Sequence, residues 1–294
     1  MIQLNLFSSR SLLYNEYMEL DQYFTKSDVA NRCLELLYDK LPGIRNKSFI
    51  EPSAGNGSFY SILPKSRRIG LDIAPQSPDI KRADFLSWEP KRSSQDKYVI
   101  VGNPPFGHRS KLAIDFFNHS ADIANTIAFI VPRQFEKYSV HSKLNKDFRL
   151  IHSQELAENS FYTPSGKDFA VRCVFQVWTR NETEHENMRI LEAPPIVHPD
   201  FEMYQYNNTP DALKFFDKDW DFAVPRQGYE DYTRREKHKN RCELNKQWIM
   251  FKVKTEQARD RLFNFDFFSL AKKNTMVYGF GKADVVMEYS KRYD

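Results

Sequence analysis

The chain has 294 residues, a hydrophobic content of 41% and a formal net charge of +4 at pH 7. This length and composition suit a globular protein of one large domain, or of a domain with a smaller partner. Residues 1–7 lack the pattern of a secretion signal, and no stretch approaches the roughly 20 apolar residues of a membrane span. The three cysteines, Cys33, Cys173 and Cys242, share no metal-ligand spacing, so we expect a reduced, cytoplasmic protein without structural zinc.

The first predicted element in chain order is a helix that follows Phe24-Thr25. Ser27 suits the N-cap, and apolar residues recur at helical spacing over 29–37. The helix should end near Lys40, because a leucine, a proline and a glycine follow it. Residues 1–21 precede these elements as an N-terminal extension.

Residues 48–59 combine a short apolar strand, a glycine-bearing turn and the start of a second helix. Gly55 and Gly57 let the backbone approach a ligand closely. The dinucleotide fingerprint would need a third glycine where Tyr60 stands, and a Walker phosphate loop occurs nowhere in the chain. Neither NAD nor a nucleoside triphosphate is therefore the favoured ligand.

Two carboxylates follow on the next segments. Asp72 lies near the end of the predicted strand 68–73, about 20 residues after the first strand, where α/β nucleotide folds place the acid that binds ribose hydroxyls. Asp84 stands beside Phe85, so a carboxylate and an aromatic ring are available together. Asp84 also suits an ordinary turn or helix cap, and the residues alone leave both roles open.

The most informative segment is Asn103-Pro104-Pro105-Phe106, which follows the apolar strand 98–102. Open α/β sheets bind ligands at the carboxyl ends of their strands. Two consecutive prolines donate no backbone hydrogen bonds and form a stiff bend with outward-facing carbonyls. Hydrogen-bond acceptors followed by an aromatic ring suit a planar amine. A plainer interpretation is that the prolines end the strand and Phe106 fills the core.

The remaining apolar runs complete a predicted α/β fold. Continuous runs of this kind are typical of strands buried on both faces, so we expect a mostly parallel sheet with helices on both sides. The later elements are a helix around 114–117, a strand at 126–131, a helix at 134–143, a strand at 150–152, an exposed loop at 160–167 and a strand at 169–178. Two further strands are predicted at 245–254 and 276–281.

In this order the segments resemble the class I S-adenosylmethionine-dependent amino-methyltransferases. Residues 48–59 resemble their motif I, and Asn103-Pro104-Pro105-Phe106 resembles their catalytic motif. Phe24-Thr25 resembles the element that precedes motif I in one permutation, found also in methylation subunits of type I restriction systems. The resemblance implies an α/β, Rossmann-like, seven-stranded sheet closed by an antiparallel pair, with residues 22–180 as the S-adenosylmethionine-binding catalytic domain.

The resemblance also implies roles in binding the cofactor. Thr25 would close over the methionine carboxylate, although Thr-Lys stands here in place of the commoner Thr-Pro. Asp72 would bind the ribose, and Asp84 and Phe85 would contact the adenine. The complete predicted cofactor-binding set is Thr25, Glu51, Ser53, Gly55, Gly57, Asp72, Ile73, Asp84, Phe85 and Asn103.

At the catalytic motif the resemblance implies methylation of an amino nitrogen without a metal. The Asn103 side-chain oxygen and the Pro104 carbonyl would accept the two amino hydrogens, which draws the nitrogen lone pair back from the ring. Pro105 would stiffen the bend. Phe106 would stack on the extruded base, a contact worth about 1 to 3 kcal/mol.

Residues 181–294 are predicted to form a smaller C-terminal target-recognition region. Two of its segments are basic and lie near aromatic residues in the sequence, a combination that can contact phosphates and replace bases. A solvated loop is the plainer interpretation of such charges. The predicted nucleic-acid-binding residues are Arg234, Arg235, Lys237, Lys239, Arg241, Lys272 and Lys273.

Adenine N6 in DNA is the favoured target, and nucleic acid is the expected partner. RNA, methylated at adenine N6 or guanine N2, is the main alternative, because the C-terminal region is small for reading a long DNA site. Release-factor glutamine is disfavoured because those enzymes usually carry Tyr where Phe106 stands. Cytosine N4 is disfavoured because Ser-Pro-Pro is commoner there. A non-catalytic nucleic-acid-binding subunit is the alternative from another class.

Overall fold

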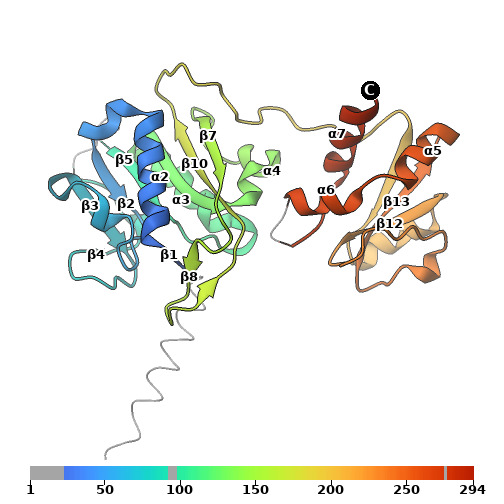
Figure 1. The fold of residues 1–294 in the computed structure, drawn as a ribbon, viewed down its shortest axis with the longest axis horizontal. Coiled ribbons are helices and arrows are strands. Elements are labelled where there is room, and N and C mark those ends of the chain that lie inside the picture. Colours follow the sequence, from blue (N-terminus) through green and yellow to red (C-terminus); the bar gives the residue numbers. More distant parts are fainter. Residues whose placement is uncertain (1–22, 92–97, 275–276) are drawn as a thin grey trace, which may run out of the picture. The chain divides into compact units, whose positions relative to one another are not determined.

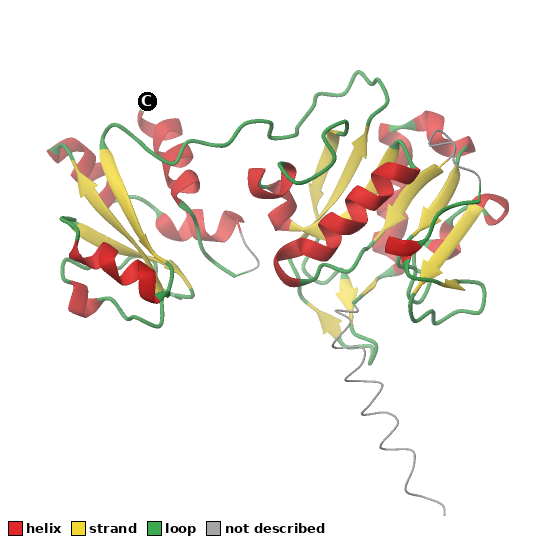
Figure 2. Cartoon of the chain, turned by 180° about the vertical axis from the view of Figure 1, so that it is seen from behind, coloured by secondary structure: helices red, strands yellow, loops and turns green. Residues whose placement is uncertain are grey.

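A computed structural model describes residues 23–91, 98–274 and 277–294 (Figures 1 and 2). The chain divides into two compact units, the first reaching to Leu191 and the second spanning Glu192–Asp294. The sequence placed this division at residue 180. It falls later in the structure because residues 185–190 form hydrogen bonds with the first unit. The predicted N-terminal extension, residues 1–21, lies outside the described residues.

The first unit is built on a seven-stranded sheet in the order β4-β3-β2-β5-β6-β10-β7. Neighbouring strands from β4 to β6 are parallel, whereas β10 is antiparallel to both β6 and β7. The predicted seven-stranded α/β sheet with its closing antiparallel pair is confirmed. The strands are β2 (Ser48–Glu51), β3 (Arg68–Asp72), β4 (Lys81–Arg82), β5 (Tyr98–Gly102), β6 (Thr126–Pro132), β7 (Arg149–Glu155) and β10 (Cys173–Thr179).

Helices cover both faces of this sheet, α2 (Ser27–Lys40) on one face and α3 (Lys111–Ile123) on the other. Figure 1 views the sheet from the α2 side, and Figure 2 views it from the α3 side. The strand β5 is apolar throughout because both of its faces are buried. Val99 and Val101 belong to the core beneath α2, whereas Ile100 belongs to the core beneath α3.

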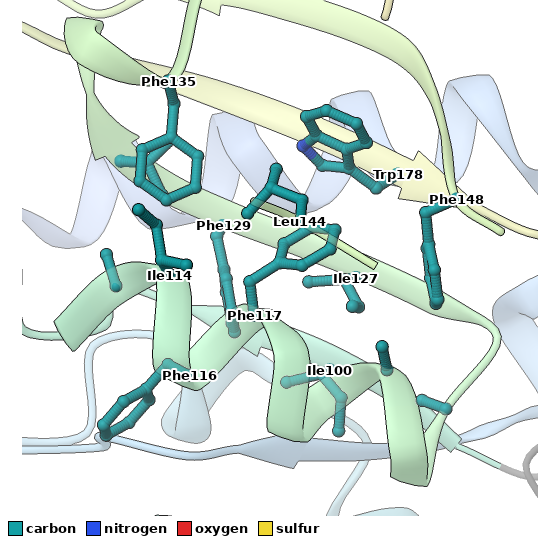
Figure 3. Packing of buried hydrophobic residues seen from close by; sticks show 14 of the residues in the cluster. Ile100, Ile114, Phe116, Phe117, Ile127, Phe129, Phe135, Leu144, Phe148 and Trp178 are labelled. Carbon is teal, nitrogen blue, oxygen red and sulfur yellow. The ribbon is translucent and has the colours of Figure 1, made fainter. Parts of the chain in front are cut away.

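Large aromatic side chains fill the core beneath α3 (Figure 3). The ring of Phe117 meets the rings of Phe148 and Trp178 edge to face, with centroids 5.6 and 5.2 Å apart. Such aromatic pairs add stabilisation beyond the area that they bury. The same packing holds α3, and with it the segment that leads from the end of β5.

Short 3-10 helices occupy several places where the sequence suggested longer helices. Residues 134–143 contain the 3-10 helix η7 and the one-turn helix α4 (Tyr138–His141). After β2 the chain makes turns in which Gly55 and Gly57 have φ of +51° and +87°, so no α-helix starts there. Over the described residues of this unit, the 3-10 helices are η1 (Pro42–Asn46), η2 (Tyr60–Ile62), η3 (Lys65–Arg67), η4 (Phe85–Ser87), η6 (His108–Ser110) and η7 (Arg133–Glu136).

The helix α2 runs over the predicted residues, but its N-cap is Lys26 and not Ser27. Ser27 is the first helical residue, and no side chain caps this end. The chain enters the helix from a strand, because the backbone N–H of Lys26 donates to the carbonyl of Ser160 at 3.0 Å. A long-range pairing thus sets the start of the helix.

A small antiparallel sheet in the order β1-β8-β9 forms where the sequence predicted an exposed loop. In it β8 (Phe161–Tyr162) pairs with β1 (Phe24–Thr25) on one side and with β9 (Asp168–Phe169) on the other. Phe169 therefore belongs to this sheet, and the terminal strand β10 begins later, at Cys173. The pairing brings the Phe-Thr element against a hairpin more than a hundred residues away in sequence.

The C-terminal unit has its own sheet, in the order β11-β13-β12, with both pairs antiparallel. The predicted strand at 245–254 is confirmed as β13. The predicted strand at 276–281 is wrong over its described residues 277–281, because Gly279 makes only an isolated bridge to Gln227. The elements are β11 (Phe201–Tyr206), η8 (Pro210–Asp217), β12 (Phe222–Gln227), η9 (Lys239–Arg241), β13 (Gln247–Val253), α5 (Glu256–Phe263), α6 (Phe267–Asn274) and α7 (Lys282–Tyr293).

Two apolar clusters, one on each face of this sheet, give the C-terminal unit its core. Helices α5 to α7 pack on one face, and η8 packs on the other. Within the described parts of both units, no helix combines the length and the apolarity that a membrane crossing requires.

Arg189 ties the end of the first unit to its body. Its guanidinium donates to the backbone carbonyls of His141, Leu144, Asn145 and Phe148 at 2.6 to 2.8 Å, and only 8% of the residue is exposed. These carbonyls lie at the end of the short helix α4 and in the residues that follow it, and α4 has too few turns to satisfy its own end. Residues beyond 180 therefore complete the fold of the first unit.

Replacing Arg189 with Met should destabilise the protein by about 2 to 4 kcal/mol. The change keeps the apolar stem and removes the side-chain donor to the carbonyls of Leu144 and Phe148. Urea unfolding, followed by circular dichroism, measures this loss. Lys146→Met on the same surface is the matched control, since Lys146 is exposed. A loss for Arg189→Met no larger than that of the control would contradict the clamp.

Candidate active site

A cavity of about 380 Å³ lies at the carboxyl ends of β2, β3 and β5. Seven of the residues that line it were not predicted from the sequence: Tyr23, Phe24, Pro52, Ala83, Leu86, Leu112 and Phe116. Ten predicted site residues from four separate segments also line it. They are Ser53, Gly55, Asp72, Ile73, Asp84, Phe85, Asn103, Pro104, Pro105 and Phe106.

The turn after β2 is held by the carboxylate of Asp72. One oxygen accepts from the backbone N–H of Gly55 and the other from that of Ala74, both at 2.7 Å. Each carboxylate oxygen has a second lone pair, so Asp72 can still accept from a ligand in the cavity. At Gly55 the φ is +51°, and an added Cβ would lie 3.1 Å from the Phe24 ring. The positive φ and the close Phe24 ring therefore favour glycine at this position.

Three predicted cofactor-binding residues, Thr25, Glu51 and Gly57, do not line the cavity. Glu51 is buried close to Gly102, since a Cβ added to that glycine would lie 3.2 Å from the Glu51 Cγ. Burial raises the pKa of Glu51 well above its usual value. The nearby charge of Asp72 acts in the same direction, whereas backbone N–H groups act against it. Glu51 therefore favours its protonated form.

Asp84 and Phe85 border another part of the cavity. The Asp84 carboxylate accepts from the backbone N–H of Leu86 at 3.0 Å and caps η4. Phe85 is buried, and its ring packs against that of Phe116 at 5.2 Å. Asp84 thus has the capping role that the sequence left open, and its contact with an adenine amino group stays a prediction.

The amide of Asn103 has a defined orientation. Its Nδ2 donates to Thr25 Oγ1 at 3.2 Å and to the Tyr23 backbone carbonyl at 3.4 Å. A carbonyl oxygen can only accept, so the amide nitrogen must face Tyr23 and Oδ1 must face away. Oδ1 is buried and has no hydrogen-bond partner within the described part of the chain. A buried acceptor without a partner costs about 1 to 3 kcal/mol and calls for an explanation.

The strand β1 that carries Thr25 is held from two sides. Ser58 Oγ donates to the Thr25 carbonyl at 2.6 Å, and Asn56 Nδ2 donates to the Tyr162 hydroxyl at 2.5 Å. The Tyr23 ring stacks on that of Phe169, with centroids 3.8 Å apart. The turn after β2, the β8–β9 hairpin and the bend at residues 103–106 are therefore joined through β1. The short Phe-Thr element was the only sequence signal of this arrangement.

Most of the predicted nucleic-acid-binding cations of the C-terminal unit are engaged within that unit. The guanidinium of Arg235 donates to backbone carbonyls that include those of Phe263 and Phe265. The ion pairs are Arg234 with Glu236 and Glu243, Lys239 with Asp217, and Lys273 with Glu288, all at 2.8 to 3.1 Å.

The remaining three of these cations are Lys237, Arg241 and Lys272. Lys272 Nζ lies 4.7 Å from the centroid of the Phe268 ring, whereas Lys237 and Arg241 are simply exposed. The Arg234 guanidinium lowers the pKa of the Glu243 carboxyl to about 2, so that ion pair is intact at neutral pH. Binding of nucleic acid by this set stays a prediction.

No group of three or more His, Cys, Asp or Glu side chains suited to a metal occurs among the residues that the structure describes.

Replacing Glu51 with Gln should change how stability depends on pH. Because burial raises the pKa of Glu51 above its usual 4.5, the wild type loses stability as pH rises from that value through the folded-state pKa. The neutral glutamine does not, so the variant should gain stability relative to the wild type as the pH rises above about 4.5. Urea unfolding at several pH values checks this, with the exposed Glu89→Gln as control. A difference that stays constant with pH would show that Glu51 titrates normally.

No protein-family model and no curated protein matches this sequence. Among solved structures, similar ones include a candidate RNA methyltransferase from Pyrococcus horikoshii, with 17% identity and a TM-score of 0.43 over 54% of this chain and 88% of that one. A type I restriction-modification methyltransferase subunit from Streptococcus thermophilus has 14% identity and a TM-score of 0.42, over 59% and 48%. The type IIL restriction-modification enzyme MmeI in complex with DNA has 11% identity and a TM-score of 0.47, over 95% of this chain and 66% of that one. These values are too low to carry an argument about function.

Proposed function

We propose that the first unit transfers a methyl group from S-adenosylmethionine to the exocyclic amino group of a nucleobase, adenine N6 in DNA being the favoured target. The observation that carries this proposal is Asn103 Oδ1, a buried acceptor without a partner among the described residues, on a side chain that lines the cavity. Pro104, Pro105 and Phe106 line the same cavity beside it. An acceptor and an aromatic ring at one site match the needs of an amine on a planar base.

The cavity suits the cofactor in size and in chemistry. Ligand pockets of about 300 to 1,000 Å³ are usual for small molecules. Gly55 lets the backbone approach a ligand, and Asp72 has lone pairs available for ribose hydroxyls. Asp84 and Phe85 offer a carboxylate and an aromatic edge for a base. When bound, S-adenosylmethionine supplies an electrophilic methyl group on a sulfonium.

The protein's contribution to the reaction is to prepare the amine. The lone pair of an exocyclic amine is shared with the ring, so the nitrogen is a poor nucleophile. Asn103 Oδ1 would accept one amino hydrogen and the Pro104 carbonyl the other, which favours a pyramidal nitrogen in the transition state. Phe106 would stack on the extruded base and hold its plane. Fixed dipoles of this kind need no reorganisation during the reaction.

The C-terminal unit supports a nucleic-acid substrate in a limited way. It has its own core and sheet, as a target-recognition domain that follows a catalytic domain would have. RNA is the alternative substrate, and a non-catalytic nucleic-acid-binding subunit is the alternative outside enzymes. A binding subunit would have no use for an orphaned amide acceptor, so Asn103 favours the enzyme.

Replacing Asn103 with Ala should lower methyl transfer by about 100-fold or more, because it removes a transition-state acceptor. Cofactor affinity, measured by calorimetry, should change little. Asp72→Ala should instead act first on cofactor binding, with the affinity for S-adenosylmethionine falling by about 10-fold or more. Transfer of tritium from labelled S-adenosylmethionine into duplex DNA, single-stranded DNA, RNA and protein identifies the substrate. Equal loss of cofactor affinity in both variants would count against Asn103 as the amine acceptor.

Replacing Thr25 with Val tests the orientation of the Asn103 amide. The change keeps the shape and removes the hydroxyl that accepts from Asn103 Nδ2, so kcat should fall by about 10-fold. Thr25→Ser keeps a hydroxyl and should restore most of the rate. If Thr25 instead contacted the cofactor carboxylate, the Val variant would mainly lose affinity for S-adenosylmethionine. Calorimetry and steady-state kinetics on both variants separate these roles.

A further inference from the structure

A strained turn follows the catalytic bend directly. Gly107, Arg109 and Ser110 have φ of +65°, +53° and +62°, so two adjacent residues other than glycine take the left-handed conformation. This conformation costs free energy for every residue with a Cβ, and such strain is concentrated at functional sites. Within the first unit, these two are the only such residues among those that the structure describes.

The surrounding structure imposes the conformation of this turn. Ser110 is buried, and its hydroxyl donates to Gln134 Oε1 at 2.8 Å. The backbone N–H of Ala113 donates to the Phe106 carbonyl at 3.3 Å. A Cβ on Gly107 would lie only 2.8 Å from the Cβ of Leu112. The turn is thus anchored at both ends and packed against α3, so it holds a fixed position.

The turn presents the side chains of His108 and Arg109 to solvent. His108 and Arg109 are exposed, and neither makes a hydrogen bond or an ion pair with the residues that the structure describes. The next cation, Lys111, is already paired with Asp115 at 2.6 Å. Arg109 therefore differs from Arg234, Lys239 and the other paired cations, because its guanidinium is available to a ligand.

The turn lies at the rim of the cavity. Phe106 on one side of it and Leu112 on the other both line the cavity. A base that enters this cavity remains attached to its strand, so its flanking phosphates stay outside, near the rim. A guanidinium can bind a phosphate through two parallel hydrogen bonds.

We propose that Arg109, with His108 beside it, binds a backbone phosphate next to the target nucleotide. This inference rests on the proposed function and specifies its substrate as a polyanionic strand. A glutamine side chain in a protein would bring no such anion to the rim. The strain at Arg109 is then the cost of placing its side chain where the strand enters.

Salt dependence of binding tests the proposal with the full-length protein. Binding of fluorescent single-stranded DNA, duplex DNA and single-stranded RNA is measured by anisotropy between about 50 and 200 mM NaCl. Arg109→Gln should weaken binding several-fold and should lower the slope of log affinity against log salt by about 0.7 on single strands and 0.9 on duplex, the value for one phosphate contact. Lys111→Gln, which removes a neighbouring paired cation, should leave the slope unchanged.

A glycine variant separates this role from a structural one. Glycine adopts positive φ without strain, so Arg109→Gly should keep or raise the melting temperature while binding falls as it does in Arg109→Gln. If the wild type binds DNA and both Arg109 variants bind it with the wild-type slope, the phosphate contact is refuted and the proposed function stands. If the wild type binds neither DNA nor RNA, this inference and the nucleic-acid substrate are refuted together.

Discussion

The orientation of one buried amide is the constraint on which this site depends. The carbonyl of Tyr23 can only accept a hydrogen bond, so it turns the Asn103 nitrogen toward β1 and leaves Oδ1 without a partner in the part of the chain that the structure describes. The position of Tyr23 depends in turn on the pairing of β1 with β8 and on the stacking of its ring on Phe169. A hairpin remote in sequence therefore helps to determine which atom of the Asn103 amide is paired within the described part of the chain.

Positive charge serves different purposes in the two units. In the C-terminal unit, Arg234 and Arg235 stabilise the fold through ion pairs and bonds to carbonyls. Arg189 does the same for the first unit. Arg109 has no such partner among the described residues and occupies a strained backbone position. A count of cations along the sequence cannot distinguish these uses, because the partners of each cation come from distant segments.

Several sequence-based expectations failed for one common reason. Ser27 is a good N-cap by type, but the pairing of Lys26 with Ser160 determines where the helix begins. Phe169 belongs to an apolar run that suggested one long strand, yet it pairs with Phe161 in the small sheet. Each local preference is weak, and contacts with residues far away in sequence outweighed it.

The sequence by itself determined the seven-stranded sheet and the segments that meet at its carboxyl edge. Continuous apolar strands such as β5 can only be buried on both faces, and the stiff bend after β5 must end it at that edge. The tertiary structure alone decided the direction of the Asn103 amide, the burial of Glu51 and the availability of Arg109. These properties depend on hydrogen-bond partners and solvent access, which arise only when distant segments pack together.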